Sequence, residues 1–220
     1  MMTGTGLMTG TETGQDSDNP LHTINRSALA ERFFSARNSF KNLISTHLNK
    51  VLMIRRAKQN DIPCLVALIN SAYRGEASKK GWTTEANLVS GDIRTDTKQL
   101  EELMNNPGTA FIVWENEKGL LEGSVYLHKN ENTLYLGMLS VLPELQAKGI
   151  GKKLMNAAED YARLEHCNSI YMRVISARQE LIAWYEKLGY KNSGRTEHFE
   201  NNKYGTAIRP LEFIIMEKLI

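Results

Sequence analysis

The sequence predicts an α/β (α+β) fold, with a mixed, mostly antiparallel seven-stranded sheet and helices on both of its faces. The first observation is the order of apolar runs and amphipathic stretches along the chain, which indicates β-α-α-β-β-β-α-β-α-β-β. The second is the length of 220 residues, which suits one domain with a substantial core and leaves little for a second compact domain. We expect this domain to cover residues 51–220, after an N-terminal extension over residues 1–50.

The bulk composition narrows the classes of function. A formal net charge of +2 is too small to indicate a nucleic-acid partner. The two cysteines, Cys64 and Cys167, form neither a disulfide framework nor a zinc pattern, so a reducing compartment is expected. No apolar stretch approaches the roughly 20 residues that a membrane-spanning helix needs. We therefore expect no integral membrane association.

The N-terminal extension differs in composition from the rest of the chain. Residues 1–20 are rich in Gly, Thr and Asp and hold little that could be buried, which predicts disorder. Residues 26–50 follow as a basic amphipathic stretch with helical spacing, in which Glu31 is the one acid. Such a stretch is a transit peptide, which would place the protein in an organellar matrix, a surface helix that packs on the domain, or translated sequence upstream of a true start. Because acidic residues precede it, we predict a cytoplasmic protein.

The first half of the domain predicts one strand, two helices and a hairpin. Residues 51–56 form the first strand, and Asn60 and Asp61 can cap a helix whose first turn tolerates Pro63. The apolar stripe of that helix consists of Leu65, Leu68 and Ile69.

A polar segment, residues 73–96, leads to a second amphipathic helix around Leu100 and Leu103. Residues 109–116 and 120–129 flank the turn-forming sequence Glu-Lys-Gly and predict a hairpin. The next run, residues 132–143, is a third long strand that ends at its proline.

The second half predicts two helices and three strands. A long helix runs to about Glu165, with an apolar face that includes Leu154 and Ala158. Residues 169–176 form a strand, and the helix after it is closed by Gly189, a good C-terminal cap. Two final strands follow, at about residues 190–199 and 210–220.

The turn before the long helix has the features of an anion site. Residues 146–151 read Gln-Ala-Lys-Gly-Ile-Gly, and a glycine turn at a helix start exposes N–H groups to an anion. The phosphate loop of nucleotide triphosphatases does not fit, because Gln146 stands at its first glycine and Lys153 at its hydroxyl position. The dinucleotide fingerprint does not fit either, because Leu154 stands at its third glycine.

A third glycine-turn pattern that precedes a helix is Gln/Arg-x-x-Gly-x-Gly/Ala after a strand that ends in Val-x-Pro. In it the sequence resembles the GNAT superfamily of acyl-CoA-dependent N-acetyltransferases, with Gln146, Gly149 and Gly151 at the motif positions. A second signature agrees: residues 180–190, ELIAWYEKLGY, look like the Tyr-Glu-Lys-Leu-Gly-Phe/Tyr helix of that family. The order of strands and helices matches over residues 51–220, so the resemblance implies the GNAT-type fold.

The resemblance implies acetyl-CoA as the acyl donor and assigns residues to its binding. Backbone amides of the glycine turn bind the pyrophosphate in this family, and the preceding strand splays at a bulge and pairs with the pantetheine arm. Gly137 is a candidate for that bulge. The matching positions are Leu139, Ser140, Val141, Gln146, Ala147, Lys148, Gly149, Ile150, Gly151 and Lys152.

Tyr185 matches the tyrosine that lies near the acyl sulfur in the family. A phenol there can donate a proton to the leaving thiolate, and a backbone N–H near Leu139 can stabilise the oxyanion. The general base stays unassigned, with Glu76, Glu85 and Asp92 as candidates. Where many members have an asparagine, this sequence has Arg178, which either binds a carboxylate or phosphate group or lies on the surface. No metal is expected.

The acceptor is predicted to be a primary amine of a small molecule. Tyr73, Glu76 and Trp82 are tentative substrate residues, since aromatic and charged side chains together suit a small polar ligand. The long loop over residues 198–210 can close one side of a cleft, which favours a small molecule over a protein. A protein N-terminal or lysine acetyltransferase and a catalytically weak acyl-CoA-binding sensor remain alternatives. The oligomeric state, a homodimer included, stays open.

Overall fold

The computed structural model describes residues 53–201 and 205–220, and the predictions for the N-terminal extension lie outside these residues. Four longer helices and one short one join the strands, with single 3-10 turns at Gln59–Asp61 and Pro143–Leu145. The helices are α2 (Ile62–Tyr73), α3 (Gly75–Ser78), α4 (Thr97–Asn105), α5 (Ile150–Leu164) and α6 (Gln179–Lys187). The strands are β1 (Ile54–Arg56), β2 (Val89–Ser90), β3 (Thr109–Glu115), β4 (Leu121–Asn130), β5 (Thr133–Val141), β6 (Ser169–Ile175), β7 (Lys191–His198), β8 (Thr206–Ala207) and β9 (Glu212–Leu219).

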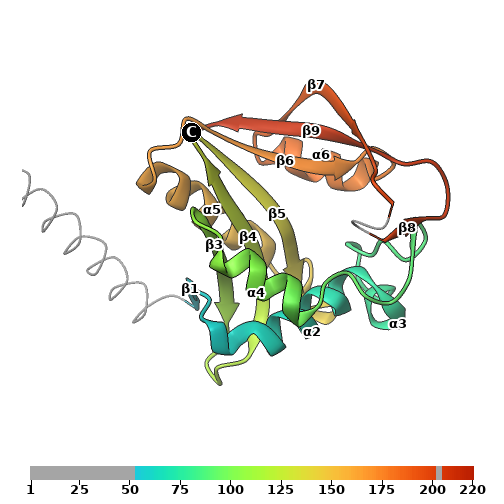
Figure 1. Ribbon diagram of the computed structural model, residues 1–220, viewed down its shortest axis with the longest axis horizontal. Helices are drawn as coiled ribbons and strands as arrows, with labels where there is room; N and C mark the ends of the chain where they lie inside the picture. The colour runs from blue at the N-terminus through green and yellow to red at the C-terminus, as the bar shows by residue number, and fades with distance from the viewer. Residues whose placement is uncertain (1–52, 202–204) are drawn as a thin grey trace, which may run out of the picture. The chain divides into compact units, whose positions relative to one another are not determined.

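Seven strands form one sheet in the order β1-β3-β4-β5-β6-β9-β7 (Figure 1). Five of its neighbouring pairs are antiparallel and one, β5 with β6, is parallel. The mixed, mostly antiparallel seven-stranded sheet predicted from the sequence is therefore confirmed. The parallel pair exists because α5 carries the chain back across the sheet between β5 and β6.

Helices cover both faces of the sheet, and the alternation of side chains in β3 shows how. Phe111 and Val113 pack with residues of α2 and α4 in one hydrophobic cluster. Ile112 and Trp114 belong to a second cluster, which holds the apolar residues of α5 and α6. Successive side chains of a strand point to opposite faces, so one strand contributes to two cores.

The sequence pattern located every strand of the large sheet and the four longer helices. It missed α3 and the two-residue pairing of β2 with β8, because both lie in segments that it assigned to polar loops. Asp61 stands at the N-cap position of α2, but its carboxylate accepts hydrogen bonds from the Lys58 backbone N–H (2.7 Å) and from Arg55. The Arg55 hydrogen bond lowers the pKa of Asp61 below its usual value.

The parallel strands β5 and β6 pair only over their first halves and then diverge, as Figure 1 shows. The last paired residues are Leu136 and Met172. Beyond them β5 carries a bulge, where the register with β4 shifts and Met138 takes a φ of 46°. Met138 and Leu139 have no partner in the described strands on either side, so the main chain here is open to another molecule.

The turn before α5 and the start of α6 both lie at the open end of this divergence. A third hydrophobic cluster borders it and joins β6 and β9 to the segment before α4. In the described part of the chain, no helix has the length and apolar character needed to span a membrane.

Candidate active site

Two cavities meet where β5 and β6 diverge. The first, which we call the β6 cavity, has a volume of about 80 Å³ and is lined by β5, β6 and the loops around Glu85 and Arg94. The second, the α5 cavity, has a volume of about 250 Å³ and is lined by the turn before α5 and by residues of α6. Both are lined by Tyr73, Leu139, Leu181 and Tyr185.

The turn before α5 presents main-chain donors to the α5 cavity. Gly149 is the N-cap of α5 at a φ of 86°, and no side chain caps the helix. Ala147 also takes a left-handed φ, 61°, which a residue with a Cβ rarely adopts. In the described chain, the hydrogen bonds outside helices and strands use none of the N–H groups from Ala147 to Lys152. These donors and the helix dipole favour an anion at this point.

The side chain of Gln146 fixes this turn to the loop before β2. Its amide nitrogen donates to Thr83 Oγ1 (2.8 Å) and to the Val141 carbonyl (3.0 Å), and its Oε1 accepts from the Trp82 N–H (2.8 Å). Gly81 makes room for it, because a Cβ there would lie 2.7 Å from the Gln146 amide. Gln146 thus shapes the wall of the α5 cavity through its side chain.

Tyr185 is buried at the junction of the two cavities. Burial, together with the neighbouring phenol of Tyr73, raises the pKa of Tyr185 well above its ordinary value, so the group stays protonated at neutral pH. Its ring contacts Trp184 and Tyr190, at centroid distances of 5.0 and 6.1 Å. The backbone is fixed as well, because Gly189 closes α6 at a φ of 89° and the Tyr190 N–H donates to the Tyr185 carbonyl.

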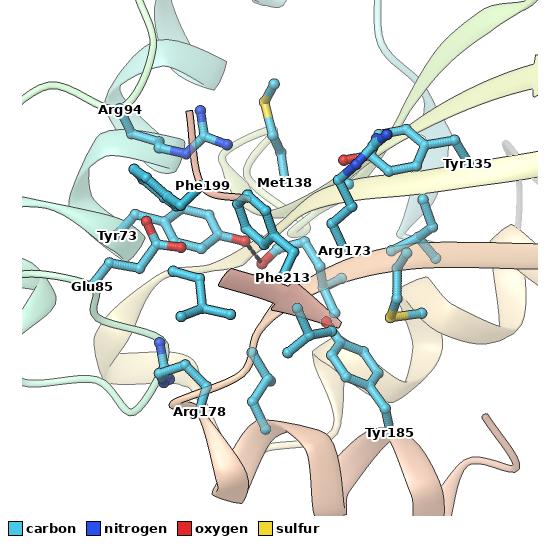
Figure 2. A pocket seen from close by; sticks show the side chains of 17 residues that line it. Tyr73, Glu85, Arg94, Tyr135, Met138, Arg173, Arg178, Tyr185, Phe199 and Phe213 are labelled. Atoms are coloured by element: carbon cyan, nitrogen blue, oxygen red, sulfur yellow. Dashed lines mark hydrogen bonds between the residues drawn. The ribbon is translucent and has the colours of Figure 1, made fainter. Parts of the chain in front are cut away.

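Tyr73 reaches the bulge of β5 from the end of α2. Its hydroxyl donates to the Leu139 carbonyl at 2.8 Å, which holds the unpaired stretch of β5 in place (Figure 2). Burial and the nearby carboxylate of Glu85 raise the pKa of Tyr73, so it remains a donor. The predicted substrate residue Tyr73 therefore lies between both cavities.

The β6 cavity carries most of the charge of the site (Figure 2). Glu85 forms an ion pair with the buried guanidinium of Arg74. Arg94 lies over the ring of Tyr73, 5.9 Å from its centroid. Arg173 lies over the ring of Tyr135 at 5.2 Å and donates to Glu197 at 2.6 Å.

Arg178 is buried and acts as a clamp between two segments. Its guanidinium donates to the backbone carbonyls of Trp82, Thr83 and Thr84 and to the carboxylate of Glu180. The sequence left two options for Arg178, binding of an anionic group and a surface position. The surface position is wrong because the residue is buried, and the carboxylate that it binds is that of Glu180 in the same chain. Arg178 instead fixes the loop that forms one wall of the α5 cavity. The signal in the sequence that could have indicated this role was the position of Arg178 at the start of α6, seven residues before Tyr185.

The other predicted site residues divide between the cavities and their surroundings. Seven of the ten positions matched to acetyl-CoA line the α5 cavity: Leu139, Val141, Gln146, Ala147, Gly149, Gly151 and Lys152. Ser140 and Ile150 are buried away from it, and Lys148 is exposed beside it.

Only some of the tentative substrate residues and candidate bases line the two cavities. Trp82 lines the α5 cavity and packs edge-on against Trp184. The side chain of Glu76 lines neither cavity, because α3 turns it into solvent, where it is 87% exposed and pairs with Lys79. Asp92 is exposed and lines neither cavity. Glu85 is the candidate base that faces the β6 cavity.

Several residues of the β6 cavity escaped the sequence analysis. Arg94, Tyr135, Met138 and Arg173 come from three separate stretches, the loop before α4, β5 and β6, and none belongs to a motif. Within residues 53–201 and 205–220, no three His, Cys, Asp or Glu side chains are grouped so that they could hold a metal ion.

Comparison with known proteins identifies curated relatives over about half of the chain. The N-acetylaspartate synthetase of Xenopus tropicalis is 34% identical over 109 residues, which are 48% of this chain and 40% of that protein. The spermidine N(1)-acetyltransferase of Vibrio cholerae is 29% identical over 120 residues, 48% of this chain and 66% of that protein. The chain thus spans less than half the length of the Xenopus relative.

Solved structures share the fold at low sequence identity. A ribosomal-protein-alanine N-acetyltransferase from Brucella melitensis superposes with a TM-score of 0.58 at 22% identity, over 76% of this chain and 99% of that one. A GNAT superfamily phosphinothricin acetyltransferase from Sinorhizobium meliloti, solved in complex with AcCoA, gives 0.56 at 16% identity, over 76% and 87%.

The sequence profile of the acetyltransferase (GNAT) family matches residues 72–190. This range contains the glycine turn, the divergence of β5 and β6, and Tyr185. More than half of the chain matches, and the fold is the one that the neighbours share. The chain therefore belongs to the GNAT acetyltransferase family.

Proposed function

We propose that this protein is an acetyl-CoA-dependent N-acetyltransferase that acts on the primary amine of a small molecule. The observation that carries the proposal is the junction of the two cavities at Leu139 and Tyr185. A donor in the α5 cavity and an acceptor in the β6 cavity would meet there, next to an unpaired main chain and a protonated phenol. A protein acceptor and a binding-only role are the alternatives that the experiment below separates.

The α5 cavity has the chemistry that coenzyme A requires. The pyrophosphate would accept hydrogen bonds from the N–H groups of residues 147–152, at the positive end of α5. Lys152 at the same end lines the cavity and adds positive charge. The pantetheine arm would lie along Leu139 and Val141, where β5 has left β6. The structural neighbour solved with AcCoA supports this donor.

The reaction would be a direct attack. The amine nitrogen bonds to the thioester carbonyl carbon and forms a tetrahedral oxyanion, which the Leu139 N–H stabilises. The carbon–sulfur bond then breaks, its electron pair goes to sulfur, and the Tyr185 hydroxyl protonates the thiolate. Before the attack the acceptor ammonium loses one proton to Glu85 or to water, so the attacking species is the neutral amine. The nitrogen loses a second proton to water as the amide forms, and the products are the amide and the free thiol. Tyr185 recovers its proton from solvent.

The size of the β6 cavity favours a small acceptor. At about 80 Å³ it is far smaller than the roughly 300 Å³ at the lower end of sites for drug-sized ligands. Pairing of β2 with β8 ties the loop before β9 to the loop before α4 beside this cavity. The relatives named for small amines, aspartate and spermidine derivatives, are in keeping with this size. We also propose that residues 51–220 carry the activity and that the protein is cytoplasmic.

Thiol release from acetyl-CoA over a panel of amines and N-terminal peptides tests the proposal. We expect acceptor-dependent release with small amines and little with peptides, together with calorimetric binding of CoA by the full chain. Peptides as the better acceptors would move the function to protein acetylation. Binding of CoA without release for any acceptor would make the protein a sensor, and absence of CoA binding would refute the proposal altogether.

A further inference from the structure

The ring of Tyr135 limits how far the β6 cavity extends along β5. We infer, on the basis of the proposed function, that Tyr135 determines the length of the acceptor: a primary amine is acetylated efficiently when the group that it carries fits between Leu139 and this ring. Of the residues of β5 that line the cavity, Tyr135 is the farthest from Leu139 along the strand. Figure 2 shows it beside Arg173, on the side of the cavity away from Glu85.

Gly137 allows the ring of Tyr135 to lie along the strand. Side chains at positions i and i+2 of a strand point to the same face, so a side chain at position 137 would stand beside that of Tyr135. A Cβ at Gly137 would lie 2.9 Å from the Tyr135 hydroxyl oxygen and 3.0 Å from Cε1. The end of the ring therefore lies over the main chain of Gly137 and points towards the bulge at Met138. At about 3.3 Å of rise per residue, roughly 7 Å of strand then separates it from Leu139.

Side chains of the two neighbouring strands hold the ring in this place. Tyr126 of β4 lies at a centroid distance of 6.3 Å from it, and Tyr171 of β6 at 5.4 Å. The guanidinium of Arg173 lies over the ring at 5.2 Å and donates to Glu197 at 2.6 Å. Aromatic and cation–π contacts of this kind each restrain a ring. Tyr135 is thus a fixed wall that does not swing aside for a longer ligand.

The two ends of the acceptor meet different constraints. Its nitrogen must reach the thioester carbon beside Leu139 and Tyr185, where the two cavities join. Its other end meets Tyr135, and one methylene group more than a pocket holds costs about 10- to 200-fold in kcat/KM. Tyr135 is only half-buried, so replacement of its ring by a methyl group would open the cavity towards solvent and make room for a longer chain.

The test uses unbranched alkylamines as acceptors: ethylamine, butylamine, hexylamine and octylamine, each assayed for thiol release from acetyl-CoA. The basicity of the amine is nearly constant along this series, so differences in kcat/KM report the fit of the chain. For the wild type we expect kcat/KM to fall about 10-fold or more between butylamine and hexylamine. In Tyr135→Ala this fall should disappear, so that hexylamine and octylamine are used at least as well as butylamine.

A matched control and a milder variant accompany Tyr135→Ala. Tyr171 stands opposite Tyr135 in the register of β5 with β6 and is also half-buried, but it lines neither cavity. Tyr171→Ala should therefore keep the length profile of the wild type. Tyr135→Leu keeps an apolar side chain over Gly137 and should give an intermediate profile; it takes the place of Tyr135→Ala if that variant does not fold. Thermal unfolding of each variant shows whether it is folded.

Gly137 supplies a second test that removes no side chain. Gly137 does not take a left-handed φ, so the backbone accepts an alanine there, and the three atoms nearest to its Cβ would all belong to Tyr135. Gly137→Ala should displace the ring and lower kcat/KM for butylamine about 3- to 10-fold. In the Tyr135→Ala background the same substitution should change kcat/KM less than about 2-fold, because the ring that it would displace is gone. Equal effects of Gly137→Ala in both backgrounds would contradict the inference.

The outcomes separate this inference from the proposed function. If the wild type uses octylamine as well as butylamine, or if Tyr135→Ala has the length profile of the wild type, the inference is wrong while the N-acetyltransferase function stands. The inference is equally wrong if other small amines are acetylated but no alkylamine is, by either the wild type or Tyr135→Ala. If no amine at all promotes thiol release although CoA binds, the proposed function fails and the inference fails with it.

Discussion

Three phenol side chains near the junction differ in what they can do chemically. Tyr73 is bonded to the Leu139 carbonyl, and Tyr190 contacts Tyr185 but lines neither cavity. Tyr185 lines both cavities, and its hydroxyl has no hydrogen-bond partner in the described chain. Because burial raises its pKa, Tyr185 keeps its proton at neutral pH. It is thus the phenol that could transfer a proton to a leaving thiolate.

We expect Tyr185→Phe to lower kcat about 100-fold or more, with little change in the KM for acetyl-CoA, because a general acid contributes chiefly to the transition state. Steady-state kinetics of thiol release measure both constants. Tyr190→Phe is the matched control, since its hydroxyl is also buried but has no hydrogen-bond partner among the described residues. Its kcat should stay at the wild-type value. Equal rates for Tyr185→Phe and the wild type would exclude proton transfer from this phenol.

The turn before α5 depends on backbone conformation more than on side chains. Gly149 takes a left-handed φ of 86°, and a Cβ there would meet no atom within 4 Å. An alanine at Gly149 would therefore act only through the main chain, and an L-residue in this region costs about 1–2 kcal/mol. Gly194, in the bulge of β7, has the same properties, with a φ of 79° and no atom within 4 Å of a Cβ.

This pair yields a prediction about the turn. Gly149→Ala and Gly194→Ala should lower the free energy of unfolding by similar amounts, about 1 kcal/mol each, in urea titrations. Only Gly149→Ala should raise the Kd for CoA, about several-fold, because only there does relaxation of the strain reorient N–H groups that would bind the pyrophosphate. Equal affinities for CoA in both variants would indicate that the turn does not bind it.

Elements with a strong local signal were predictable from the sequence. The stripe of α2, Leu65, Leu68 and Ile69, is buried as expected, and Gly189 ends α6 in the left-handed conformation of a C-terminal cap. The bulge in β5 is confirmed as well, next to Gly137 at Met138. In contrast, α3 and β2 have four and two residues, too few for a periodic pattern to develop.

The β6 cavity was the least predictable part of the site. Its charged residues come from the loops before β2 and α4, from β6 and from the start of α6, and only the tertiary fold brings them together. The role of Gln146 is another example, because its contact with Trp82 spans 64 positions of sequence. A motif can identify the glycine turn, whose function depends on adjacent residues, but it cannot identify partners that the tertiary fold provides.

At the scale of the whole domain, buried tyrosine side chains lie in the hydrophobic cores on both faces of the sheet. Tyr126 packs with α2 and α4, whereas Tyr185 and Tyr190 belong to the cluster under α5 and α6. Burial raises the pKa of Tyr126 to about 12, and it also raises the pKa of Tyr73, Tyr185 and Tyr190. The folded protein therefore retains phenolic protons at a pH where the unfolded chain, with phenol pKa values of about 10, has lost them.

This difference predicts a loss of stability in alkali. Below pH 10 both states are protonated and the phenols make no pH-dependent contribution. Above it the unfolded chain binds fewer protons, so the free energy of unfolding should fall with rising pH, by at least about 1 kcal/mol per pH unit by pH 11. Urea unfolding at pH 8, 9, 10 and 11 measures the slope. In Tyr126→Phe the loss between pH 10 and 11 should be smaller than in the wild type, since one phenol that resists ionisation up to about pH 12 is gone. A wild-type stability that is constant from pH 9 to 11 would contradict the prediction. It would mean that these phenols ionise as readily in the folded domain as in water, although they are packed in two separate cores.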